Sequence, residues 1–108
     1  MTILNDFKFF GDVSEAKKSN ILYNPQMASE LILQVSGDGN FSISIYGKVD
    51  REKEDSFKLS AINMKDFSIG DTITKSGIYV VAIEGISEIY AELENINGKV
   101  NAYGKLAE

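Results

Sequence analysis

The sequence has no cysteine, no histidine and no tryptophan, and it has one proline in 108 residues. Without cysteine the chain cannot form a disulfide, use a thiolate nucleophile or bind zinc through sulfur. Without histidine it lacks the commonest general base and the commonest metal ligand. These gaps exclude the most frequent catalytic and metal sites. We therefore expect a protein that is not an enzyme and that uses no cofactor or metal.

Charge and hydropathy argue against two further classes of partner. The chain has 16 acidic and 11 basic residues and a net charge of -5, and a surface of that sign repels a phosphate backbone. The nearest basic clusters are Lys17-Lys18 and the Arg51/Lys53 pair, and the second lies among acidic residues. No window approaches the roughly 20 apolar residues of a membrane helix, and the N-terminus lacks the pattern of a signal peptide. We expect no nucleic-acid partner, no membrane partner and a chain that is not exported.

The strand pattern is clearest in the stretch Gly77 to Leu106. It contains three strand-like runs separated by the turns Glu-Gly-Ile-Ser at 84–87 and Asn-Ile-Asn-Gly at 95–98. Apolar residues alternate with polar ones in the last two runs, which is the pattern of strands buried on one face. The predicted inward residues are Ile89, Ala91, Leu93, Val100, Ala102 and Leu106. With 108 residues and 44% hydrophobic composition, we expect one β-sandwich domain over residues 1–108.

Shorter strands are predicted at 20–23, 30–35, 41–49 and 57–63, and Val13 to Ser19 is predicted as a loop or one helical turn. The sequence Ser-Gly-Asp-Gly-Asn at 36–40 predicts a hairpin turn. We expect Met64, Phe67 and Ile69 to be further core residues. The charged run at 50–55 is interpreted as a solvated loop.

Residues 1–12 are aromatic-rich and have two interpretations. Phe7, Phe9 and Phe10 fit the first strand of the sandwich, and they also fit an arm that lies across a neighbouring subunit. Strand is the simpler interpretation. The arm interpretation makes the three phenylalanines candidate interface residues.

Two segments of the chain repeat a pattern. Residues 43–49 and 100–106 both carry Tyr-Gly-Lys after an alternating pair, and each follows a strand and a Gly/Asn turn. This predicts two similar halves, each contributing a hairpin to a two-sheet antiparallel sandwich of jelly-roll type. Tyr46 and Tyr103 then point away from the core. They could be isolated surface tyrosines, or on one sheet face they could form an interface, because tyrosine buries much area at low entropic cost.

Acidic residues provide the remaining candidate sites. Glu88, Glu92 and Glu94 share the outward face of their predicted strand and could bind a hard cation such as calcium, but a solvated acidic face is the simpler interpretation. The turn at 36–40 lacks the spaced acids of a calcium loop. No acid pair is spaced for glycoside hydrolysis, and no base accompanies a nucleophilic serine. No catalytic, cofactor-binding or metal residues are predicted.

The C-terminal third resembles a pattern in small structural proteins of tailed bacteriophages. The residues that carry the resemblance are Gly77, Tyr79, Val81, Gly85-Ile86-Ser87, Ile89, Leu93, Gly98, Val100 and Tyr103-Gly104. The pattern also has an arginine in the strand after Gly-Ile-Ser. Here that strand carries Tyr90 and Glu92 and no arginine, which leaves the subtype open. The resemblance implies a capsid decoration or head-fibre protein, or a tail or baseplate accessory, with no catalytic residues.

The resemblance also implies partners and a location. We expect a virion protein that is synthesised in the host bacterial cytoplasm and binds the major capsid protein or other virion proteins. A homo-oligomer is expected, with a trimer favoured over a dimer. The alternative from another class is a carbohydrate-binding module with Tyr46, Tyr79, Tyr90 and Tyr103 as its platform, although the tryptophan that such platforms often use is absent.

Overall fold

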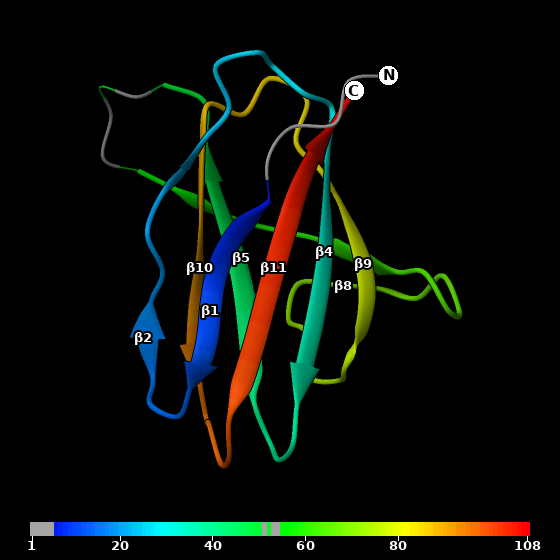
Figure 1. Cartoon of the computed structure of the whole chain (residues 1–108). Helices are drawn as coiled ribbons and strands as arrows, with labels where there is room; N and C mark the ends of the chain where they lie inside the picture. The colour runs from blue at the N-terminus through cyan, green and yellow to red at the C-terminus, as the bar shows by residue number, and fades with distance from the viewer. Residues whose placement is uncertain (1–5, 51, 53–54) are drawn as a thin grey trace.

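The computed structural model describes residues 6–50, 52 and 55–108, and these residues form two antiparallel β-sheets. The first sheet has six strands, in the order β1 (Phe7–Val13), β11 (Val100–Ala107), β4 (Glu30–Gly37), β9 (Gly77–Ala82), β7 (Ala61–Asn63) and β8 (Ile69–Gly70). The second has β2 (Lys17–Lys18), β10 (Glu88–Glu94), β5 (Ser42–Lys48) and β6 (Phe57–Leu59), and β3 (Leu22–Tyr23) also pairs with β10. The sheets lie one in front of the other (Figure 1). The prediction of an all-β two-sheet sandwich is confirmed.

The strand pairs are nested in the way that defines a jelly roll. β1 pairs with β11, β2 and β3 pair with β10, β4 pairs with β9, and β5 pairs with β6. The first strand therefore pairs with the last. Strands further from the N-terminus pair in turn with strands further from the C-terminus, which is the arrangement of a jelly roll. β7 and β8 are an added hairpin at the edge of the first sheet. No helix occurs among the described residues, and so none there is long and apolar enough to cross a membrane.

The two halves of the chain have equivalent topology. In chain order, the N-terminal strands β1, β3, β4 and β5 correspond to the C-terminal strands β6, β9, β10 and β11. If each strand is replaced by its counterpart, the order β1-β11-β4-β9 becomes β6-β5-β10-β3, which is the second sheet read backwards. The repeated Tyr-Gly-Lys segments lie in β5 and β11, which are equivalent under this exchange. The pairing of the strands thus supports the prediction of two similar halves.

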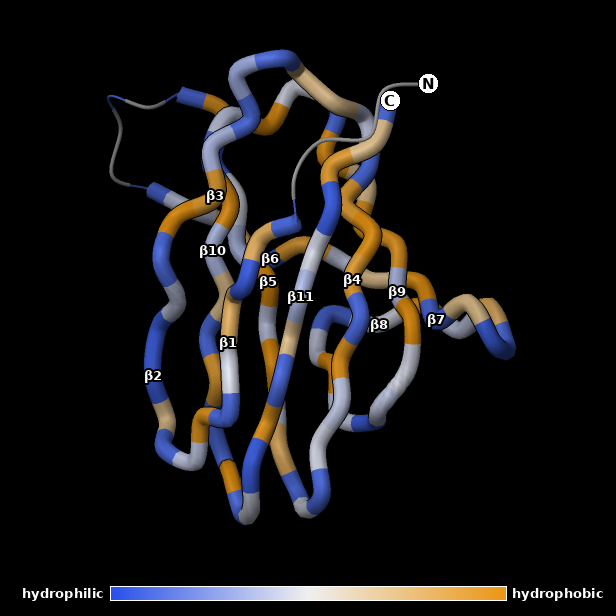
Figure 2. The backbone as a smooth tube through the Cα atoms, in the orientation of Figure 1, coloured by the Kyte–Doolittle hydropathy of each residue, from blue (hydrophilic) through white to orange (hydrophobic). Residues whose placement is uncertain are grey.

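The core lies between the sheets and is formed by the predicted inward residues. Along β10 and β11 the residues Ile89, Ala91, Leu93, Val100 and Ala102 are all buried. β4 alternates in the same way, which Figure 2 shows as hydrophobic and hydrophilic segments in succession along its tube. Each strand therefore buries one face and leaves the other to solvent.

The turns predicted as hairpins connect the two sheets instead. The turn at 36–40 joins β4 of the first sheet to β5 of the second, and the turn at 95–99 joins β10 to β11 in the opposite direction. The hairpin prediction was wrong, because strands that face each other across a core show the same alternation as strands paired edge to edge. The two connections contact each other: Asn97 N donates to Asn40 O over 2.8 Å, and Lys99 N donates to Asp38 Oδ1 over 2.7 Å.

Three other predictions also need correction. Lys17–Lys18 within the predicted loop is β2, which pairs with β10. The run at 57–63 is two strands, because β6 belongs to the second sheet and β7 to the first. Met64, Phe67 and Ile69 are exposed rather than buried. Of the charged loop at 50–55, residues 51, 53 and 54 lie outside the described residues.

Glycine in the repeated segments has a packing role in both sheets. A Cβ on Gly104 would lie 2.9 Å from Leu31 Cδ1 and 2.9 Å from Phe9 Cε2, and a Cβ on Gly47 would lie 2.8 Å from Ile86 Cγ2. Both positions face inward where a neighbouring side chain crosses over the strand. The repeat therefore reflects the same packing requirement at equivalent places.

We expect Gly104→Ala to lower the free energy of unfolding by about 1–3 kcal/mol, because the added methyl overpacks the core. Urea unfolding measures the effect. Gly77→Ala is the matched control, because a Cβ at this position would lie no closer than 3.6 Å to a neighbouring atom, which is an ordinary contact distance. Equal losses in the two variants would contradict the packing role.

Candidate functional site

The predicted N-terminal interface residues belong to the sandwich itself. Phe9 and Phe10 are buried in the core, and Phe7 is half-buried with its ring edge against Phe9 at 4.8 Å between centroids. All three lie in β1, which pairs with β11 at the edge of the first sheet. Phe9 and Phe10 are therefore not free to contact a partner, and the part of the predicted arm that precedes Asp6 lies outside the described residues.

Tyr46 belongs to an aromatic cluster on the outer face of the second sheet. Its ring is stacked on that of Tyr90, with centroids 5.2 Å apart and planes 11° from parallel. Lys18 Nζ lies 4.1 Å from the centroid of the Tyr90 ring, and the Tyr90 hydroxyl is 2.7 Å from Ser56 Oγ. β2 and β5 flank β10 on opposite sides, so Lys18 and Tyr46 cover the two faces of the Tyr90 ring. Sugar stacking requires a free ring face, which Tyr90 does not offer.

Partial burial in this cluster raises the pKa of the Tyr46 phenol, and the neighbouring Glu92 carboxylate raises it further by repulsion and by accepting a hydrogen bond. Because the pKa of Tyr46 is higher in the folded state than in the unfolded state, the protonated phenol contributes to the stability of the fold. This contribution is complete below the ordinary tyrosine pKa of about 10 and is lost as the pH rises through the folded pKa.

We expect Glu92→Gln to lower the pKa of Tyr46 toward its ordinary value, because the negative charge beside the phenol is removed. Ultraviolet titration of tyrosinate formation measures the change. Tyr46→Phe identifies the phase, since that variant lacks the phenol. If the high-pH phase persists in Tyr46→Phe, its assignment to Tyr46 is wrong.

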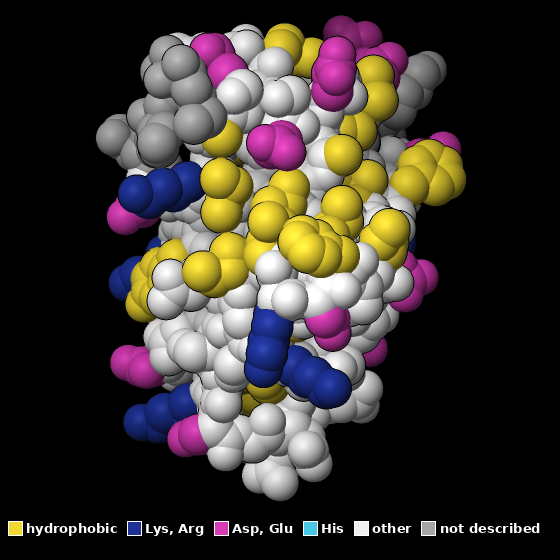
Figure 3. Space-filling view, turned by 90° about the vertical axis from the view of Figure 1, so that its right-hand side faces the viewer, with side chains coloured by type: hydrophobic (Ala, Val, Ile, Leu, Met, Phe, Trp, Pro, Cys, Tyr) yellow, Lys and Arg dark blue, Asp and Glu magenta, His cyan; other side chains and the backbone are white. Residues whose placement is uncertain are grey.

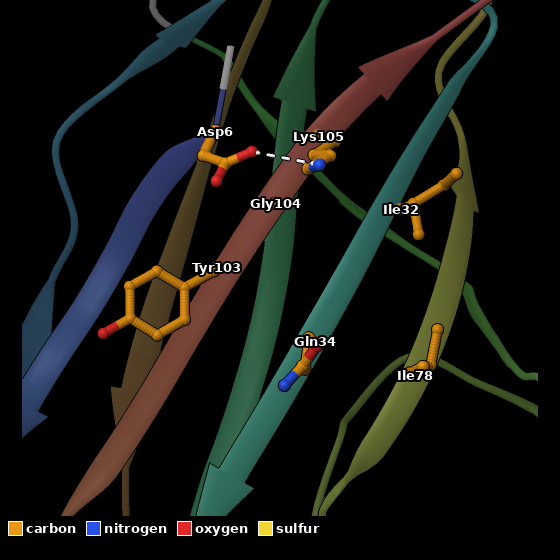
Figure 4. Close-up of a pocket in the computed structure, with 7 residues that line it drawn as sticks. All are labelled: Asp6, Ile32, Gln34, Ile78, Tyr103, Gly104 and Lys105. Carbon is orange, nitrogen blue, oxygen red and sulfur yellow. Dashed lines mark ion pairs between the residues drawn. The ribbon is translucent and has the colours of Figure 1, made fainter. Parts of the chain in front are cut away.

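Tyr103 stands on the outer face of the other sheet, beside a shallow groove of about 340 Å³ (Figure 4). The register aligns Tyr103 with Gln34 and Gln34 with Ile78 across three strands. Lys105 Nζ lies 3.4 Å from Asp6 Oδ1 at the same groove. That ion pair contributes at most about 1 kcal/mol, because both side chains are more than half exposed. The groove can contact an extended segment, and its lining has no nucleophile with a base.

The predicted tyrosine face does not exist as one surface. Tyr46 and Tyr103 lie on opposite outer faces of the sandwich, because β5 and β11 belong to different sheets. Tyr79 is buried and its hydroxyl donates to Lys75 O over 2.8 Å. The alternating pattern correctly placed Tyr46 and Tyr103 on outward faces, but it could not tell which sheet each strand joins. Of the four tyrosines of the sugar-platform hypothesis, Tyr46 and Tyr90 lie together, whereas Tyr79 is buried and Tyr103 lies on the opposite face.

The acidic residues of β10 form no cation site among the described residues. Glu92 and Glu94 point outward as predicted, but Glu88 is buried and its Oε1 lies 3.7 Å from Lys48 Nζ. Glu88 is thereby engaged by a basic residue of the neighbouring strand β5.

A row of partly or fully exposed apolar side chains crosses the β4–β9–β7–β8 part of the first sheet. Ile32 is aligned with Val80, Val80 with Ile62, and Ile62 with Ile69. Ile78, Met64 and Phe67 adjoin this row. Figure 3 looks onto the β7–β8 side and shows hydrophobic side chains in a band across it. We call the following residues the apolar band: Ile32, Ile62, Met64, Phe67, Ile69, Ile78 and Val80.

Phe67 is the aromatic side chain of the band. It is 69% exposed and lies in the turn between β7 and β8 with a φ of 60°, a region that non-glycine residues seldom adopt. Its N–H donates to Asn63 O over 2.7 Å, and Asn63 N donates to Ser68 O over 2.9 Å. The turn thus holds a phenylalanine out in solvent in an unfavourable backbone conformation. Such features occur at functional positions.

Sequence reasoning missed the band because it assigned Met64, Phe67 and Ile69 to the core. A signal was present, since Met64 and Phe67 flank Lys65-Asp66, and a charged pair between them fits a turn better than a buried strand. The Ser68 backbone and hydroxyl donate to the Asp66 carboxylate and, with a smaller contribution from Lys75, lower its pKa. Asp66 therefore remains ionised in this turn.

Comparison with known proteins adds structural relatives. No family model matches the chain, and no curated protein sequence matches it. The crystal structure of SPBc2 prophage-derived protein YomS matches with a TM-score of 0.84 and 21% identity, over 98% of this chain and 95% of that one. The PBSX exported protein XepA matches with a TM-score of 0.86 and 19% identity. This chain has their fold. The second match covers 97% of this chain and 37% of XepA, so the chain spans about a third of that protein's length.

Proposed function

We propose that this chain is a non-enzymatic structural protein of a bacteriophage particle, and specifically a decoration protein that binds the outer face of the capsid shell. The resemblance of the C-terminal stretch to virion proteins supports this, and so does the fold shared with proteins whose names assign them to the SPBc2 and PBSX prophages. The same proposal includes synthesis in the bacterial cytoplasm and assembly as a homo-oligomer.

The observation that carries the assembly of copies in this proposal is the apolar band. Contiguous apolar surface on a folded domain marks a place of protein contact. The band lies on a paired sheet and on a turn fixed by backbone hydrogen bonds, so it can meet a partner with little loss of conformational freedom. A rigid module with a permanent contact surface suits a protein that functions by binding in many copies.

Repetition on a symmetric shell strengthens such binding. When neighbouring copies contact both the shell and each other, each further contact is made at high effective concentration, so modest interfaces give firm attachment. A decoration protein therefore needs no single tight site, which agrees with the shallow groove and polar sheet face described above.

Co-sedimentation with particles tests the proposal. Purified protein is mixed with empty capsids, and separately with tails, of the phage or prophage that carries the gene, and each mixture is sedimented through a sucrose cushion. We expect saturable pelleting with capsids in a fixed ratio to the capsid protein. Pelleting with tails alone would replace decoration by a tail or baseplate role, and no pelleting with either would overturn the proposal.

A further inference from the structure

The apolar band is bordered by opposite charges at its two sides. Lys75 precedes β9, and Lys65 follows Met64, whose N–H donates to Ile78 O near the start of β9. At the other end of β9, Ala82 is aligned with Glu30, and Glu84 follows two residues later. These four charged side chains belong to exposed residues. In Figure 3 blue side chains lie directly below the band and magenta side chains lie above it.

The one acid at the basic side is already engaged. Asp66 accepts hydrogen bonds from Ser68 N at 3.0 Å and Ser68 Oγ at 2.7 Å. Its charge is therefore partly satisfied within its own turn, and the nearby Lys75 makes a smaller favourable contribution. Among the described residues neither Lys65 nor Lys75 forms an ion pair. The basic side of the band keeps two lysines that can meet acids of a partner.

This arrangement is self-complementary under a two-fold rotation. If the axis lies in the plane of contact and runs along the band, across the strands, the band of one copy covers the band of the other. The same rotation places the basic side of each copy against the acidic side of its partner. An isologous pair makes each such contact twice, and complementary charges fix the orientation of the two partners.

Net charge favours this orientation. Each copy carries a net charge of -5, so two copies repel one another unless the lysines of the contact face oppose acids. An in-plane two-fold axis that runs along the strands instead would bring Glu30 and Glu84 toward their own equivalents. The in-plane two-fold axis along the band buries both bands and also places opposite charges against each other.

We propose that the apolar band binds a second copy of this chain and that two copies pair through it about a two-fold axis. Phe67 is the anchor, because it is the exposed aromatic residue of the band and aromatic anchors dominate binding energy. Lys65 and Lys75 of each copy face Glu30 and Glu84 of the other. The pairing is argued from the band alone, so it stands or falls separately from the location of the protein in a phage particle.

Sedimentation equilibrium of the purified chain over a wide concentration range tests the pairing. We expect a reversible dimer that Phe67→Asp weakens roughly thirtyfold or more. Phe57→Asp is the matched control, because Phe57 is 70% exposed but lies in β6 of the other sheet, and it should leave the dimer unchanged. Circular dichroism establishes that both variants are folded. A trimer, a monomer at every concentration, or equal effects of the two variants would overturn the proposal.

Charge reversal distinguishes self-pairing from binding to another protein. Lys75→Glu and Glu84→Lys should each weaken homodimers by roughly three- to tenfold, because each creates like-charge contacts twice. A mixture of the two variants should form heterodimers in preference to either homodimer, since every contact is then between opposite charges. The double variant should regain wild-type affinity. No preference in the mixture and no recovery in the double variant would contradict the two-fold arrangement.

Discussion

Replacing Phe10 by alanine is expected to lower the free energy of unfolding by about 3–5 kcal/mol, which is the usual cost of removing a buried phenylalanine ring. Phe10 is 1% exposed and belongs to the core between the sheets, although it lies only a few residues from the start of the described chain. In β1 it is aligned with Ala102 of β11, which is also buried. Thermal and urea unfolding measure the loss.

The control for this prediction is Lys8→Ala, which changes an exposed residue of the same strand and should shift stability by less than about 0.5 kcal/mol. The experiment also decides between strand and arm. If Phe10→Ala kept wild-type stability and abolished only binding to particles, β1 would act as an arm and the packing described here would be wrong.

Asn24→Asp is expected to cost about 3–5 kcal/mol near neutral pH, because it places an unpaired negative charge in a buried site. Asn24 is 1% exposed. Its amide nitrogen donates to Ala28 O and Ile86 O at 3.1 and 3.0 Å, and its Oδ1 accepts from Ala28 N at 2.9 Å. Aspartate keeps the shape but loses both donors, and its carboxylate faces two carbonyl oxygens.

The loss should depend on pH with a definite sign. Burial beside carbonyl oxygens raises the pKa of the introduced carboxyl in the folded state above its unfolded value. Its contribution to stability is therefore most favourable below the unfolded pKa of about 4 and is lost as the pH rises through the folded pKa. The difference from wild type should be small at low pH and grow toward neutrality. Asn20→Asp, at an exposed position, is the control, and a deficit in Asn24→Asp that is independent of pH would contradict the buried hydrogen-bond network.

The role of Asn24 could not be predicted from the sequence, where Asn24-Pro25 indicated only the end of a strand. Its partners Ala28 and Ile86 are brought together by tertiary structure, and the contact with Ile86 spans 62 residues. Local patterns give the inward and outward faces of strands, which is why the core residues of β10 and β11 were predicted correctly. They do not give which sheet a strand joins, so the connections at 36–40 and 95–99 were predicted as hairpins and two tyrosines were placed on one face.

The apolar band shows a different limit of sequence reasoning. Met64, Phe67 and Ile69 were predicted to be buried because large apolar residues usually are. In the structure these residues lie in or beside the hairpin of β7 and β8 at the edge of the first sheet, where their side chains are exposed. A sequence cannot distinguish an apolar residue selected for the core from one selected for a partner. The burial of each residue in the folded chain makes that distinction.

The most direct test of the proposed function is to determine whether the chain is part of particles. Particles from the phage or prophage that carries the gene are purified on a density gradient, and the chain is quantified by mass spectrometry relative to the major capsid protein. The account predicts that the chain bands with the particles at a constant, multi-copy ratio through successive gradients. If the chain is abundant in the lysate and absent from the particles, it is not a virion protein.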